Sequence, residues 1–135
     1  MPHISVEYSA NLGEALEMGE LCSKLLAAAT ATRLFELGAI RVRAMRADAY
    51  AIADRDSRNA FLHITFQIGS GRSYEQKRSA GDAVFSAAVT FADDLLGAGH
   101  CAVSLVLSEM DERLSWKKNA ILARLRGRAS AGAGG

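Results

Sequence analysis

The second residue of the chain is the first group that could carry out chemistry of its own. Pro2 follows Met1. Removal of Met1 is expected before a small second residue, and it would leave a proline with a free secondary amine. An ordinary α-amino group has a pKa of about 7.7–8.0. Burial and neighbouring cations lower that pKa, so this amine could act as a general base near neutral pH. The plain alternative is a chain that merely starts Met-Pro, and the dipeptide alone does not decide between the two.

Several arginines could bind a carboxylate substrate near such an amine. Arg41 and Arg43 alternate with apolar residues, and Arg72 directly follows the segment Gly-Ser-Gly at 69–71. A guanidinium binds a carboxylate through two parallel hydrogen bonds, and it would also keep a nearby amine unprotonated. A solvated surface or a salt bridge between subunits is the alternative. We favour that alternative for Arg43 and Arg46, and residue type alone leaves it open for Arg41 and Arg72.

The remaining reactive side chains show no pattern of a metal or phosphate site. The histidines and cysteines lack the spacing of metal ligands, so we expect no metal: His3, His63, His100, Cys22 and Cys101. The Gly-Ser-Gly segment is too short for a phosphate-binding loop and lacks the Lys-Ser/Thr that would follow it.

The pattern of apolar residues predicts the elements that must position these groups. Alternation of apolar and polar residues predicts strands over 2–8, about 39–53, about 61–68 and 101–110. Helical spacing predicts helices over roughly 12–33 and from Ser73 to about Leu95. Ser73 and Gln76 have the spacing of a capping box, which marks the start of the second helix.

The two halves of the chain resemble each other. His3 to Tyr8 has the same alternation as His63 to Ile68, and in each half a helix and a second strand follow. Each half should form a βαβ unit with a parallel strand pair and a right-handed crossover. Two such units predict an α+β fold, a four-stranded mixed sheet with both helices on one face. The other face should carry Ser5 and Thr65, and we expect it to pack against other subunits.

These elements define one predicted domain over residues 1–126. It contains the repeats at about 2–53 and 60–110 and a C-terminal arm over 111–126, under which Trp116 is expected to pack. The low-complexity segment 127–135 is expected to be a disordered tail.

Composition excludes several classes of protein. A chain of 135 residues with 50% hydrophobic and 23% charged residues is one globular domain and is neither disordered nor fibrous. A net charge of +1 argues against general nucleic-acid binding. There is no apolar run long enough to cross a membrane, and the first residues do not form a signal peptide. With two separated cysteines in apolar surroundings, a cytoplasmic location is expected.

Several segments carry a resemblance to two related families. Residues 71–77, Gly-Arg-Ser-Tyr-Glu-Gln-Lys, resemble a segment of the 4-oxalocrotonate tautomerases, which have one βαβ unit per chain, and residues 103–110 are similar to the second strand of that family. The two-unit length, the start at 2–7, the strand at 38–43 and the long stretch at 61–73 resemble the 5-carboxymethyl-2-hydroxymuconate isomerases. The resemblance runs from Pro2 to about Leu125.

The resemblance implies a homotrimeric isomerase without metal or cofactor. It implies Pro2 as the general base, and Arg41 and Arg72 as ligands of a small-molecule carboxylate, an unsaturated di- or tricarboxylate of the 2-hydroxymuconate type from aromatic catabolism. In the second half Leu62 replaces the proline and Ser104 replaces the strand arginine, which implies one site per chain. The segment 46–58 is less aromatic than the resemblance leads us to expect, and it would affect the choice of substrate if it lined the pocket.

Two other functions remain open at this point. The first is a non-catalytic trimeric binding or assembly protein with the same architecture, in which Pro2 is merely the start of the chain. The second is an unrelated regulatory ligand-binding domain with two βαβ units. Retention of Met1 would favour the binding protein, because no free prolyl amine would then exist.

Overall fold

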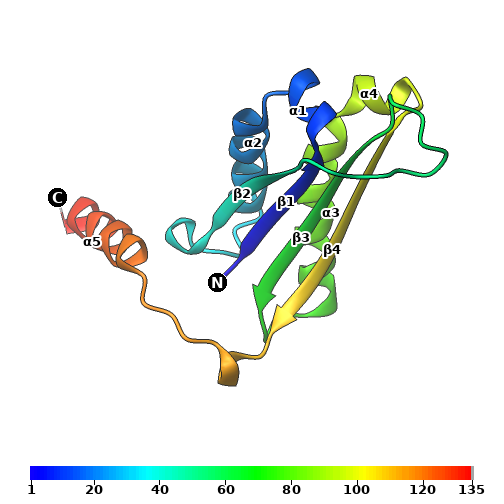
Figure 1. The fold of residues 1–135 in the computed structure, drawn as a ribbon. Helices are drawn as coiled ribbons and strands as arrows, with labels where there is room; N and C mark the ends of the chain where they lie inside the picture. The colour runs from blue at the N-terminus through cyan, green and yellow to red at the C-terminus, as the bar shows by residue number, and fades with distance from the viewer. Residues whose placement is uncertain (135) are drawn as a thin grey trace.

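The elements of the chain follow the predicted order. The structure is a computed structural model that describes residues 1–134, with side chains through Arg128. The sheet is built from β1 (His3–Ser9), β2 (Arg41–Ala47), β3 (Ala60–Gly69) and β4 (Cys101–Met110). The helices are α1 (Ala10–Ala15), α2 (Met18–Ala31), α3 (Tyr74–Phe91), α4 (Asp93–Gly97) and α5 (Ala120–Gly134), with short 3-10 turns η1 (Leu37–Ala39) and η2 (Glu112–Leu114) (Figure 1).

The sheet has the predicted mixed topology. Its four strands lie in the order β2-β1-β3-β4. The pairs β1–β2 and β3–β4 are parallel, and the two halves join through the antiparallel pair β1–β3, in which Ser5 lies opposite Thr65. The prediction of two βαβ units in one sheet is therefore confirmed.

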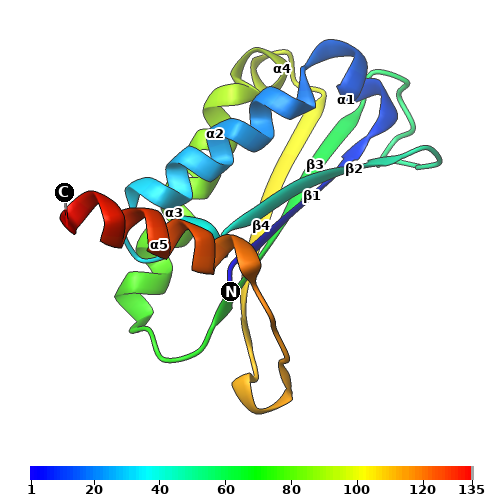
Figure 2. The ribbon, with the colours of Figure 1, turned by 90° about the vertical axis from the view of Figure 1, so that its left-hand side faces the viewer.

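The long helices cover one face of the sheet and leave the other face open. Figure 2 shows α2 and α3 on the same side of the strands. Between helices and sheet lies the apolar core, which contains fully buried side chains such as Ile4, Ile64 and Phe66. On the open face, Met45 is 50% exposed and Val106 is 56% exposed. The uncovered face therefore offers apolar side chains as well as polar ones.

The first predicted helix is two helices in the structure. The backbone is extended at Leu16 and Glu17, and the Glu17 carboxylate accepts hydrogen bonds from the backbone N–H groups of Gly19 and Glu20. Glu17 therefore starts α2 as its N-cap. The capping box at Ser73 and Gln76 is confirmed, because each side chain accepts a hydrogen bond from the backbone N–H of the other residue.

The C-terminal segment differs from the disordered tail expected over 127–135. The backbone is helical as far as Gly134, and Gly135 lies outside the described residues. Asn119 fixes the start of α5, because its side-chain oxygen accepts from the Leu122 N–H while its amide donates to the Gly38 carbonyl. Arg126 forms an ion pair with Glu36. The backbone after Arg126 continues this anchored helix, because adding a residue to an existing helix is far easier than nucleating one.

Candidate active site

One end of the sheet gathers the start of the chain and the ends of two strands. In the register of the sheet, His3 lies opposite Arg41, and Gly69 at the end of β3 lies opposite Met110 at the end of β4. Pro2 is buried here, and its carbonyl oxygen accepts a 3.1 Å hydrogen bond from the Arg41 N–H. Since Met1 precedes it in the structure, the Pro2 nitrogen is in a peptide bond and the free amine is that of Met1.

Arg41 lies at the start of β2, directly beside this terminus. Its Nη1 atom is 3.0 Å from the Met1 sulfur. A thioether is only a weak hydrogen-bond acceptor. The guanidinium is therefore directed at the terminus without a strong partner there, and a carboxylate could replace the sulfur.

Arg72 is held in place by the segment that follows α2. Its Nη2 atom donates a 2.7 Å hydrogen bond to the Leu34 carbonyl oxygen, and the guanidinium lies 4.6 Å from the centre of the Phe35 ring. Phe35 in turn packs against the buried ring of Phe66, at 5.8 Å between ring centres. This anchoring fixes the side chain while leaving several N–H donors for a ligand.

The charges around the terminus favour a neutral amine. Burial lowers the pKa of the Met1 amine below its ordinary value, and the positive charges of Lys117, Arg72 and Arg41 lower that pKa further, in this order. The Glu112 carboxylate acts in the opposite direction and raises that pKa. The structure thus brings both predicted arginines close to the start of the chain.

Two charged residues of this site were missed by the sequence analysis. Lys117 and Glu112 belong to the segment 111–119 between β4 and α5, which runs past the amino terminus (Figure 1). Glu112 approaches so closely that a side chain at Gly69 would collide with its Oε1 atom. Neither residue has a spacing in the sequence that would have marked it.

Trp116 lies in the same segment and does not pack under the arm as expected. Its side chain is 85% exposed. The segment leaves the end of the sheet, so the side chains described through Arg128 leave the indole ring largely uncovered.

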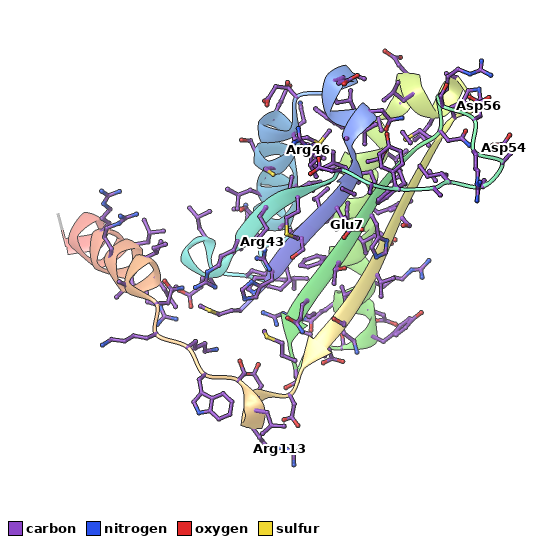
Figure 3. The ribbon with its side chains drawn as sticks, viewed as in Figure 1. Glu7, Arg43, Arg46, Asp54, Asp56 and Arg113 are labelled. Atoms are coloured by element: carbon purple, nitrogen blue, oxygen red, sulfur yellow. The ribbon has the colours of Figure 1, made fainter. Side chains whose placement is uncertain are left out.

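The other arginines of the second strand bind neighbouring side chains. Arg43 lies two residues beyond Arg41 on the same, open face, and its Nη1 atom is 3.2 Å from the Nδ1 atom of His3. Arg46 forms a 2.8 Å ion pair with Asp48. Figure 3 shows Asp54 and Asp56 at the end of the sheet opposite Arg113. The segment 46–58 therefore does not line the site at Pro2 of the same chain.

The second half of the repeat has no matching set of groups. Leu62, at the position equivalent to Pro2, is fully buried inside β3. Ser104, at the position equivalent to Arg41, shares a 2.6 Å hydrogen bond with the His63 Nδ1 atom. Neither an amine nor a guanidinium stands at these two positions.

Residues 1–134 contain neither a metal-binding cluster nor a membrane-spanning helix. No three histidine, cysteine or acidic side chains in this range are placed to hold a metal ion. No helix within the same range is both long and apolar enough to span a membrane.

Comparison with known proteins identifies the family of the chain. The family model for 5-carboxymethyl-2-hydroxymuconate isomerase matches residues 2–125. The chain is 33% identical to the 5-carboxymethyl-2-hydroxymuconate Delta-isomerase of Escherichia coli over 91% of this chain and 98% of that protein. A crystal structure of a 5-carboxymethyl-2-hydroxymuconate isomerase from Deinococcus radiodurans R1 is 39% identical, with a TM-score of 0.86 over 93% of this chain and 94% of that one.

More distant structures share the fold alone. A fused 4-OT, described as a symmetric trimer, is 16% identical with a TM-score of 0.60, over 90% of this chain and 98% of that one. The sheet order and the helices on one face match such tautomerase-fold proteins. The chain therefore belongs to the 5-carboxymethyl-2-hydroxymuconate isomerase family and is an isomerase with the tautomerase fold.

Proposed function

We propose that this isomerase converts a 2-hydroxydienoate of the 2-hydroxymuconate type into its 2-oxo isomer, with Pro2 as the general base once Met1 has been removed. The substrate is an unsaturated di- or tricarboxylate, and the reaction belongs to the breakdown of aromatic compounds. The observation that carries this proposal is the placement of a buried Pro2 beside Arg41 and near Arg72. The names of the relatives give the substrate class.

A neutral Pro2 amine can accept a proton and therefore carry out the transfer. The Pro2 nitrogen takes the proton of the 2-hydroxyl group, so the O–H bond breaks and the C2–O bond becomes a carbonyl. The double bonds shift along the conjugated chain, and the cationic nitrogen returns the proton to the distal carbon. The groups around the terminus support this step, because burial and three nearby cations lower the pKa of an amine at this end of β1.

The two arginines hold the substrate and stabilise the charge that develops on it. Arg72 is held by Leu34 and Phe35, and the Arg41 guanidinium contacts the Met1 thioether, a weak acceptor that a carboxylate could replace. Such preorganised donors stabilise the developing negative charge on the oxygen at C2 without reorganising during the reaction.

We further propose that the active assembly is a cytoplasmic homotrimer. β2 and β4 are unpaired sheet edges, and the sheet face opposite the helices carries the exposed side chains of Met45 and Val106. Free edges favour pairing with other strands. A cyclic arrangement of three copies would join these edges and bury the open faces against one another.

The test is ultraviolet absorbance of 2-hydroxymuconate mixed with the purified protein, with the N-terminus checked by intact mass. We expect loss of the dienol band and a mass that lacks Met1. A form that keeps one residue ahead of Pro2 should assemble normally but show no activity. Activity of the blocked form would remove Pro2 from the mechanism.

A further inference from the structure

The segment 111–119 crosses the end of the sheet from one edge to the other. It leaves β4 after Met110, at one edge. It ends at Asn119, whose side-chain amide donates a 2.9 Å hydrogen bond to the Gly38 carbonyl, just ahead of β2 at the other edge. Because β1 and β3 lie between these edges, the segment has to pass the start of the chain, and Figure 1 shows it there.

Lys117 and Lys118 are adjacent in this segment but are not equivalent toward the site. Lys117 is the strongest of the charged groups that act on the amine at the start of β1, whereas Lys118 is not among them. Both side chains are exposed. Within the described part of the chain, Lys117 forms no ion pair with an acidic side chain, so its ammonium group is available to a ligand.

The three cations approach the terminus from three different elements. Arg41 comes from the start of β2, Arg72 from the segment between β3 and α3, and Lys117 from the segment between β4 and α5. Two arginines are enough to bind the two terminal carboxylates of a hexadienedioate, so the third cation is left for another group. An ammonium group on a flexible stem can reach a carboxylate that hangs from the side of such a chain.

We propose that Lys117 determines specificity by binding the third carboxylate of a tricarboxylate substrate, in addition to the two carboxylates that Arg41 and Arg72 hold. The proposal rests on the function proposed above and names the substrate that this site favours. Lys117 is a specificity residue, and it neither gives nor takes the transferred proton.

The kinetic test compares a tricarboxylate with a dicarboxylate. Lys117→Ala should raise KM for 5-carboxymethyl-2-hydroxymuconate about 5-fold, because an exposed ion pair is weaker than a buried one. At a pH on the plateau of the profile, well above the pKa of the amine, its kcat should change little, and KM for 2-hydroxymuconate should change less than about 2-fold. Lys117→Arg should restore most of the preference, and the neighbouring Lys118→Ala should leave both substrates unaffected. Equal losses on both substrates, or equal effects of the two alanine variants, would overturn the proposal.

A binding measurement separates this inference from the proposed reaction. Titration calorimetry with adipate and 2-carboxymethyladipate, which cannot isomerise, measures recognition without turnover. Wild-type protein should bind the tricarboxylate more tightly, and Lys117→Ala should remove that preference. If the wild type isomerises neither muconate, the proposed function fails and calorimetry still decides the role of Lys117. If the preference survives in Lys117→Ala, the role of Lys117 is disproved whether or not the enzyme is active.

Discussion

The guanidinium of Arg72 lies 4.6 Å from the centre of the Phe35 ring, although these residues belong to different halves of the repeat. A 2.7 Å hydrogen bond from Arg72 to the carbonyl oxygen of Leu34 also holds the guanidinium at this ring. The contact joins the segment after α2 to the segment before α3 and directs a positive charge to the site. A cation over an aromatic ring is stabilised by the ring quadrupole, and planar guanidinium suits such stacking.

Arg72→Ala should lower kcat/KM for a dicarboxylate far more than it alters the fold. Loss of a charge-assisted bidentate contact costs about 1.5–3 kcal/mol, which is roughly a 10- to 150-fold decrease. Arg72→Lys should recover little, because an ammonium cannot form the paired hydrogen bonds. Steady-state kinetics with a thermal melt of each variant measure the two effects separately.

Arg41→Ala should show a decrease in kcat/KM similar to that of Arg72→Ala. Arg46→Ala is the matched control, because Arg46 lies on the same strand and pairs with Asp48 at the distant end of the sheet. It should be nearly as active as wild type. Comparable losses in all three variants would point to general charge attraction in place of a specific carboxylate site.

The pH profile should report the environment of the amine. A base must be unprotonated, so kcat/KM rises with pH through the pKa of the free amine and then levels off. Burial and the cations Lys117, Arg72 and Arg41 lower the pKa of the Met1 amine. A free Pro2 amine would lie beside the same groups, so the rise should fall below the ordinary α-amino range of about 7.7–8.0.

Two substitutions should move this rise in opposite directions. Glu112→Gln removes the charge that raises the amine pKa, so the rise should shift to lower pH. Lys117→Ala removes a charge that lowers the amine pKa, so the rise should shift to higher pH. Shifts in the same direction, or none, would show that these residues do not act on the base.

Val106→Glu should weaken the trimer. Val106 is 56% exposed on the open face in the single chain, and burial of a carboxylate without a partner between subunits is costly. Light scattering should give a trimer for wild type and smaller species for the variant. Ser86→Glu, on the exposed surface of α3, is the control and should remain trimeric. A wild-type mass near 14.4 kDa would contradict the trimer itself.

Truncation after Arg126 should leave activity and the melting temperature unchanged within error. The truncated chain keeps the Asn119–Gly38 hydrogen bond and the Arg126–Glu36 ion pair, which attach the start of α5 to the body. A shift in melting temperature of several degrees would show that the residues after 126 contribute to stability.

Local sequence patterns determined the order of the strands and long helices of the two repeats and the residue types of the candidate site, but not the break before α2 or the helix α5. The alternation over 62–68 and the capping residues Ser73 and Gln76 predicted β3 and the start of α3, because strand faces and helix ends depend on neighbours within a few residues. The repeat predicted the mixed sheet. Pro2, Arg41 and Arg72 were chosen as candidates partly from their chemistry and partly from a family resemblance.

Tertiary structure alone decided which distant groups meet at the start of the chain. Antiparallel pairing of β1 with β3 brings Gly69, and with it Glu112, to the amino terminus. The segment 111–119, which crosses the end of the sheet, places Lys117 near the same terminus. No local pattern marks such residues, because their proximity depends on strand order and on where a long connection ends. The same reason explains why Trp116 is exposed. Its apolar ring predicted burial, but its segment leaves the body of the single chain.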